Sequence, residues 1–204
     1  MTEHKPLLII IAGPNGSGKT TITSRILKHE WLEDCEYINP DDIAQNTFGN
    51  WNSDIAVKQA AQYASELREQ YLKERKSLIF ETVFSSDDKV NYVKRAIEAG
   101  YFIRIFFVAT ESPIINAARV ANRVLNGGHD VPISKIITRY SKSIYNICTV
   151  AKYVDRVYFY DNTQNGEAAK ILFRIADGKI AKQYTTNLPI WAERIKENIE
   201  FITQ

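Results

Sequence analysis

Directly after a short apolar run, the chain reads Gly13-Pro14-Asn15-Gly16-Ser17-Gly18-Lys19-Thr20. This is the spacing of a phosphate-binding loop, in which a glycine and four further residues precede Gly-Lys-Ser/Thr. Glycines let backbone N–H groups turn inward around phosphate oxygens without a clashing Cβ atom. The apolar run at 7–12 and the helix-compatible run at 21–29 supply the strand and helix that the motif requires. The stretch therefore predicts nucleotide binding, with Lys19 reaching the β- and γ-phosphates and the Thr20 hydroxyl holding Mg²⁺.

The composition is that of an ordinary globular protein. The chain has 204 residues, of which 45% are hydrophobic and 25% are charged, which suits one α/β domain over residues 1–204. The net charge of +2 gives no strong attraction to nucleic acid or membrane, so we expect neither as a partner. The polar first residues and the shortness of the apolar run after them predict no signal peptide or membrane span, and hence a cytoplasmic protein. The two cysteines, Cys35 and Cys148, lie far apart and near no His/Cys cluster, so no zinc site is expected.

Apolar runs alternate with amphipathic runs along most of the chain. Strands are expected at 7–12, 36–39, 77–82, 102–109 and 156–160, with helices at 21–29, 53–75, 87–99, 113–126 and 133–153. This alternation predicts an α/β fold with a parallel sheet and helices on both faces. Asp177-Gly178 predicts the turn of a β-hairpin at about 170–184 on the edge of that sheet, followed by a helix at about 189–201.

Two carboxylates are expected beside the phosphate loop, because ligands of such sheets lie beyond the carboxyl ends of the strands. Asp41 follows the second strand, and we expect it to accept the proton of an attacking hydroxyl and to help hold Mg²⁺. The alternative is that Asp41 or Asp42 only caps the next short helix. Glu81 ends an apolar strand and is expected to contact substrate together with Thr82, the alternative being a salt bridge to a nearby arginine.

Arginines gather after the fourth strand. Arg119 and Arg123 share one helix face, and two glycines at 127–128 break the helix after them. Guanidinium groups stabilise the charge on a transferred phosphoryl group, so we expect a lid at about 113–140 with Arg119 and Arg123 as catalytic residues. The alternative is two solvated surface arginines. His129 and Arg139 are expected to contact substrate.

The remaining nucleotide contacts are expected at two places. Thr21 continues the helix that starts at the phosphate loop and is grouped with the loop residues as a binding residue. Asn162 lies where the fifth strand ends and is expected at the base edge of the nucleotide.

These parts, taken in order, resemble the zeta-toxin family of P-loop kinases over about residues 6–163. The resemblance rests on the phosphate loop, Ile38-Asn39-Pro40-Asp41-Asp42, Glu81-Thr82, and the segment from Arg119 through Gly127-Gly128-His129-Asp130-Val131-Pro132 to Arg139-Tyr140. The same order is similar to the kinase domain of phage polynucleotide kinase.

The resemblance implies a P-loop kinase fold with five parallel strands in the order 2-3-1-4-5, and ATP with Mg²⁺ as cofactors. It places Asp41, Arg119 and Arg123 at the family's catalytic positions and Glu81 at a substrate contact. It implies phosphorylation of a sugar hydroxyl of UDP-N-acetylglucosamine, and it allows a separate antitoxin protein as a partner. One departure is Ala44, which stands where the related kinases usually carry an arginine.

Three functions are therefore open. The first is an ATP-dependent kinase, a phosphotransferase acting on the hydroxyl of a small molecule. The second is a polynucleotide 5′-hydroxyl kinase, which ranks lower because the cations Lys89, Lys94, Arg95 and Arg104 are scattered along the sequence. The third is a nucleotide-binding toxin component that acts through a protein partner.

Overall fold

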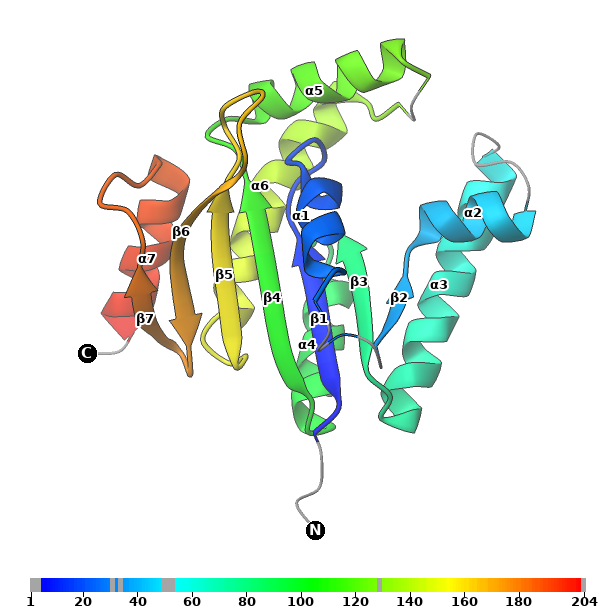
Figure 1. The fold of residues 1–204 in the computed structure, drawn as a ribbon, viewed down its shortest axis with the longest axis horizontal. Coiled ribbons are helices and arrows are strands. Elements are labelled where there is room, and N and C mark those ends of the chain that lie inside the picture. Colours follow the sequence, from blue (N-terminus) through cyan, green and yellow to red (C-terminus); the bar gives the residue numbers. More distant parts are fainter. Residues whose placement is uncertain (1–4, 30–31, 33–34, 49–53, 128–129, 203–204) are drawn as a thin grey trace.

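A computed structural model describes residues 5–29, 32, 35–48, 54–127 and 130–202. Seven strands of these residues form one sheet in the order β2-β3-β1-β4-β5-β6-β7 (Figure 1). The strands are β1 (Leu7–Ala12), β2 (Glu36–Ile38), β3 (Leu78–Thr82), β4 (Phe102–Ala109), β5 (Arg156–Asp161), β6 (Lys170–Ala176) and β7 (Lys179–Gln183).

The first five strands are parallel and lie in the predicted order 2-3-1-4-5. The predicted hairpin, β6–β7, is also present, and it pairs antiparallel with β5. The hairpin thus continues the sheet to seven strands. The predicted fold is confirmed, with a sheet wider than its five-stranded parallel part.

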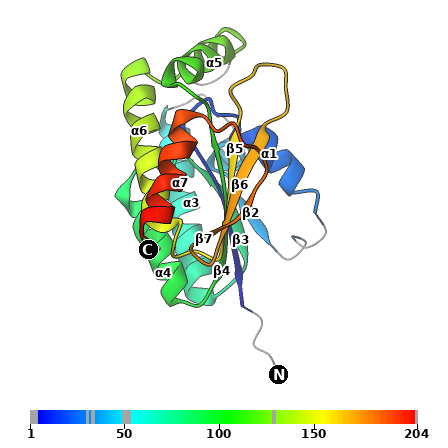
Figure 2. The ribbon, with the colours of Figure 1, turned by 90° about the vertical axis from the view of Figure 1, so that its left-hand side faces the viewer.

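Helices cover the two faces of the sheet unequally. They are α1 (Lys19–Ile26), α2 (Pro40–Phe48), α3 (Asp54–Glu74), α4 (Asp87–Glu98), α5 (Pro113–Leu125), α6 (Ile133–Val150) and α7 (Ile190–Ile202). Figure 2 shows α3, α4, α6 and α7 on one face and α1 on the other. Helix α2 occupies a stretch for which the sequence predicted a short helix without giving its bounds.

Strand β1 is buried on both sides, which is why its sequence is apolar without alternation. Its residues 8–12 are fully buried. Leu8, Ile10 and Ala12 join the large core under α3, α4, α6 and α7, whereas Ile9 and Ile11 face Ile22 and Ile26 of α1. The phosphate-loop sequence therefore emerges from the centre of the core. Among the described residues, no helix is both long enough and apolar enough to cross a membrane.

Candidate active site

The loop between β1 and α1 wraps closely against its neighbours, and its glycines make this possible. Gly16 and Gly18 have φ values of 75° and 92°, which side chains rarely adopt. A Cβ atom on Gly16 would lie 2.6 Å from the carbonyl oxygen of Asn116, and one on Gly18 would lie 2.2 Å from Nδ2 of Asn162. The loop is therefore held between α5 and the segment after β5, with its backbone turned toward the start of α1.

Lys19 is the first residue of α1 and folds back over the loop. Its Nζ donates hydrogen bonds to the carbonyl oxygens of Gly13 and Pro14, at 2.9 and 3.0 Å. Burial lowers the pKa of Lys19 to about 8; the nearby charge of Glu81 opposes this shift, that of Arg123 adds to it and that of Asp41 opposes it. Three of the charged residues predicted from the sequence thus act on the Lys19 ammonium.

The loop residues fit a polyphosphate with Mg²⁺. Among the described residues, the buried Ser17 hydroxyl has no hydrogen-bond partner, and the Lys19 ammonium bonds to neutral carbonyls. Phosphate oxygens would satisfy both groups, and the N-terminus of α1 favours an anion at this point. The exposed Thr20 hydroxyl and Asp41 carboxylate are oxygen donors of the kind that Mg²⁺ takes, one or two from protein and the rest from phosphate and water. No group of three or more metal-ligating His, Cys, Asp or Glu side chains occurs in the described part of the chain.

Glu81 is fixed at the end of β3 by two hydroxyl groups. Its Oε1 accepts hydrogen bonds from Thr23 of α1, at 2.5 Å, and from Tyr37 of β2, at 3.0 Å. Burial and the Glu81 charge raise the pKa of Tyr37 above its ordinary value, so the phenol remains a donor. Hydroxyl groups therefore hold Glu81 in place of the arginine considered from the sequence.

Asp41 lies in the first turn of α2 with an exposed side chain. The alternative reading gave this aspartate or Asp42 the task of capping that helix. The structure assigns the task to Asn39, whose Oδ1 accepts the Asp41 backbone N–H at 3.0 Å. The Asp41 carboxylate is therefore not used by the cap. Ala44, in the same helix, is 1% exposed, so the position of the family's arginine is here part of the core.

The two predicted lid arginines occupy different environments. Arg119 donates to the carbonyl oxygens of Asn162 and Thr163, at 2.7 and 3.2 Å, and to Asn165 Oδ1 at 2.9 and 2.7 Å. It thereby clasps the loop after β5. Arg123 instead lies close enough for its charge to act on Lys19. The catalytic role of both arginines stays a prediction. The hydrogen bonds of Arg119 show that it holds the segment after β5 in place.

Other predicted contacts are placed beside the phosphate loop. Arg139 lies with Nη1 3.5 Å from Asn15 Oδ1. Asn162 donates to the Ser17 carbonyl at 2.8 Å, so its side chain contacts the loop itself. The Thr82 carbonyl accepts the Gly13 N–H at 3.2 Å. His129 lies outside the described residues.

Asn116 is a site residue that the sequence reading missed. It is fully buried, donates to the Asn15 carbonyl at 2.5 Å and accepts a hydrogen bond from the Thr110 hydroxyl. The available signal was its position on α5, four residues before the buried Val120, which places an amide on the inward face of an amphipathic helix. Asn116 thus fixes the outer part of the phosphate loop from α5.

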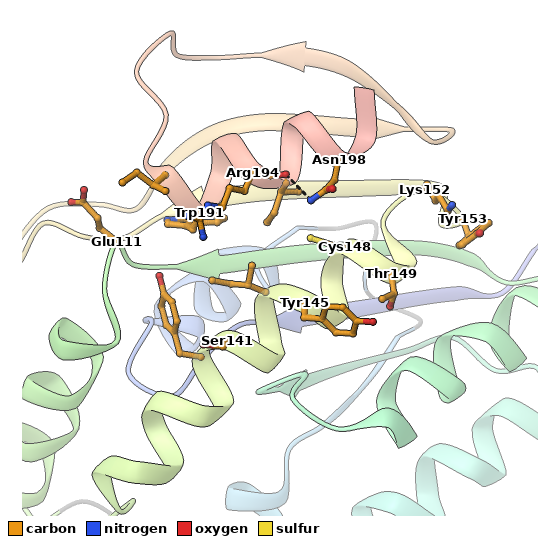
Figure 3. Close-up of a pocket in the computed structure, with 14 residues that line it drawn as sticks. Glu111, Ser141, Tyr145, Cys148, Thr149, Lys152, Tyr153, Trp191, Arg194 and Asn198 are labelled. Atoms are coloured by element: carbon orange, nitrogen blue, oxygen red, sulfur yellow. Dashed lines mark hydrogen bonds between the residues drawn. The ribbon is translucent and has the colours of Figure 1, made fainter. Parts of the chain in front are cut away.

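A separate groove of about 790 Å³ lies between α6 and α7, on the face of the sheet opposite to α1. Figure 3 shows Tyr145 and Cys148 of α6 opposite Trp191 and Arg194 of α7. Burial raises the pKa of Cys148 to about 11, which keeps its thiol protonated. None of the residues predicted from the sequence to form the site lines this groove.

Known proteins resemble this chain in sequence. The family model described as Zeta toxin matches residues 1–171. An uncharacterized protein of Haemophilus influenzae is 28% identical over 134 residues, which cover 65% of this chain and 91% of the relative.

Solved structures show the same fold at low sequence identity. A chain of the AvrRxo1-ORF1:-ORF2 complex has a TM-score of 0.66 at 17% identity, covering 94% of this chain and 64% of that one, so this chain spans less than two thirds of that neighbour. The structure from the PezAT toxin–antitoxin system of Streptococcus pneumoniae has a TM-score of 0.58 at 14% identity, covering 100% and 90%. A chain of the Pnkp1/Rnl/Hen1 RNA repair complex has a TM-score of 0.51 at 19% identity, covering 71% and 46%.

Proposed function

Because the chain belongs to the zeta toxin family, we propose that it is an ATP-dependent kinase that transfers the γ-phosphoryl group to a hydroxyl of a small molecule. The observation that carries this proposal is the convergence of charges on Lys19. The carboxylates of Asp41 and Glu81 and the guanidinium of Arg123 all act on its ammonium, at the end of the sheet where ligands of α/β proteins lie. Phosphoryl transfer needs such a set of positive groups for the phosphates and a carboxylate for the acceptor.

Each residue has a task that follows from its position. Lys19 would exchange its bonds to the Gly13 and Pro14 carbonyls for phosphate oxygens, and the Ser17 hydroxyl would gain a partner. Thr20 and Asp41 would hold Mg²⁺, which when bound neutralises charge on the phosphates. The exposed Asp41 carboxylate would also accept the proton of the attacking hydroxyl.

Glu81 would orient the acceptor. Thr23 and Tyr37 both bind Oε1, which leaves Oε2 to accept a hydrogen bond from a substrate hydroxyl. Arg123, and Arg139 beside Asn15, would stabilise charge on the transferred group. Family membership supports UDP-N-acetylglucosamine as the first acceptor to test.

The test compares ADP formation by wild type, Asp41→Asn and Asp42→Asn, with UDP-N-acetylglucosamine and a panel of other sugar hydroxyls. Asp42 is the matched control because it occupies the same turn of α2 and loses the same charge. Loss of a general base lowers the rate by about 10² to 10⁴, so Asp41→Asn should fall by that factor while Asp42→Asn stays within a few-fold of wild type. Equal rates for Asp41→Asn and wild type with every acceptor would refute the assigned base.

A separate antitoxin protein is proposed as a partner, supported by the toxin–antitoxin system from which one structural neighbour comes. Co-expression with small proteins encoded beside the gene, followed by purification of a stable complex that suppresses the kinase activity, would test this partner. Recovery of the kinase alone with each neighbour would refute it.

A further inference from the structure

The face of the sheet that carries α1 is covered by a helix only in part. Figure 1 looks onto this face: α1 lies in front of β1, and no helix of the described residues lies in front of β4 to β7. Strand β4 turns Phe106 toward α1, where it packs with Ile22 and Ile26. The residues that pair with Phe106, or lie two positions away on the same strand, therefore share this partly uncovered face.

Strand register places five cations in two adjacent rows on this face. One row reads Arg104, Arg156, Ala176 and Lys179 across β4 to β7, and the next reads Phe106, Tyr158, Arg174 and Lys182. We call this surface the basic face, defined by Arg104, Arg156, Arg174, Lys179 and Lys182. Strands β4, β6 and β7 contain no Asp or Glu, and the only one in β5, Asp161, alternates onto the other face.

Like charges stand directly opposite each other within these rows. Arg104 pairs with Arg156, and Arg174 pairs with Lys182. Such pairs destabilise a sheet when no carboxylate lies between them. A bound anion on this face would offset the repulsion between Arg174 and Lys182 at the edge of the sheet.

Aromatic rings lie among the cations. Phe106 and Tyr158 stack with centroids 4.9 Å apart and planes 10° apart, and Tyr160 lies beside them. The guanidinium carbons of Arg104 and Arg156 lie 5.6 and 5.7 Å from the Phe102 ring centroid. Lys182 Nζ lies 4.8 Å from the ring of Tyr184, a side chain that is 40% exposed.

From this placement we infer that the basic face binds a single strand of nucleic acid. Phosphates would pair with the five cations, while bases would stack on Tyr158, Tyr160 and Tyr184 and on the flat guanidinium groups. An anionic membrane would use the charges but not the planar rings, and a folded acidic protein would not match rows of cations one strand apart. The inference concerns a face outside the kinase site, so it does not depend on the proposed activity.

The experiment measures anisotropy of labelled RNA and DNA single strands of about 16 nucleotides, with excess ADP present to fill the phosphate loop. Neutralising five phosphates of a single strand gives a logarithmic salt slope of about −3.5. Affinity should therefore fall on the order of a hundredfold from about 50 to about 200 mM salt.

The test variant is Arg174→Gln with Lys182→Gln. It should reduce the salt slope of the binding constant to about −2.1 and the loss of affinity between about 50 and about 200 mM salt to about twentyfold. Because Arg174 is half-buried, Lys179→Gln with Lys182→Gln serves as a second variant whose side chains are both exposed on the edge strand. Lys58→Gln with Lys94→Gln is the matched control, since it removes the same charge from exposed positions on α3 and α4.

Loss of affinity in both basic-face variants but not in the control supports the inference. No salt-dependent binding of either strand, or equal losses in all three variants, would overturn it. Equal affinity for a duplex of the same length, or binding of phosphatidylglycerol vesicles without binding of either strand, would also overturn the assignment to single-stranded nucleic acid.

Discussion

Nucleotide affinity should depend on pH through Lys19. Its ammonium bonds to two neutral carbonyls, and burial lowers its pKa to about 8. Phosphate oxygens bind the charged form, so affinity should be highest below this pKa and should weaken as the free protein loses the proton above it. A lysine with an ordinary pKa would remain charged throughout the same range.

The size of the effect follows from the pKa. With a pKa of about 8, about nine tenths of the free protein carries the charged Lys19 at about pH 7 and about one tenth at about pH 9. The dissociation constant for ADP should rise about tenfold between these two values, which corresponds to about 1.4 kcal/mol. Binding at the higher pH should also take up nearly one proton, because the phosphates raise the Lys19 pKa in the complex.

Isothermal titration of ADP across this range, in buffers of different ionisation enthalpy, measures both the affinity and the proton uptake. Lys19→Arg should bind more weakly but with a flat profile, because a guanidinium stays charged. Lys28→Met, just beyond the other end of α1, should retain the wild-type profile. A flat profile in wild type, or the same slope in Lys19→Arg, would refute the assignment of this titration to Lys19.

Three further changes test the support of the loop. Gly16→Ala and Gly166→Ala both force a side chain to positive φ, which should lower the free energy of unfolding by about 1–2 kcal/mol. Of the two, only the Cβ at position 16 meets a backbone oxygen, at 2.6 Å, so only Gly16→Ala should also lose nucleotide binding. Equal unfolding free energies and affinities for the two variants would exclude the clash. Asn116→Ala removes the hydrogen bond from the Thr110 hydroxyl, which also bonds to the Ser112 carbonyl, and leaves the half-buried Asn15 carbonyl without its amide donor. The free energy of urea unfolding should therefore fall by about 1–3 kcal/mol, and a loss below about 0.5 kcal/mol would mean that other groups replace the amide. Arg119→Ala should raise the KM for ATP several-fold with little change in kcat, whereas a fall in kcat at constant KM would favour the catalytic role predicted from the sequence.

Local sequence predicted the parts of the fold that local physics decides. The apolar run 7–12 is a strand with those bounds because it is buried on both faces of a parallel sheet. The run 102–109 is also a strand with the expected bounds, and its residues 105–109 are buried. The dipeptide Asp177-Gly178 correctly predicted the turn of the β6–β7 hairpin. Helix α2 could not be bounded from the sequence because it is short and contains few apolar residues, Ile43, Ala44 and Phe48.

The contacts within the candidate site depend on long-range packing. The clasp of Arg119 on the segment after β5 joins residues more than forty positions apart, and the contact of Asn116 with Asn15 joins residues 101 apart. Spacing on a helix shows which residues share a face but not what that face meets. The sequence could therefore nominate two arginines, yet only the packed structure separates the one that clasps a loop from the one whose charge acts on Lys19.

The boundary of the family match divides the basic face. The Zeta toxin model ends at residue 171, so Arg104 and Arg156 lie on strands within the match, whereas Arg174, Lys179 and Lys182 lie beyond it. The cations judged scattered from the sequence were Lys89, Lys94, Arg95 and Arg104, of which only Arg104 belongs to the basic face. Residues 104, 156, 174 and 182 come together only when β6 and β7 extend the sheet. Two arginines on β4 and β5 alone would be a short basic edge. The added hairpin turns that edge into two rows of cations and rings, so any binding of nucleic acid should be confined to relatives that carry both the arginines and the hairpin.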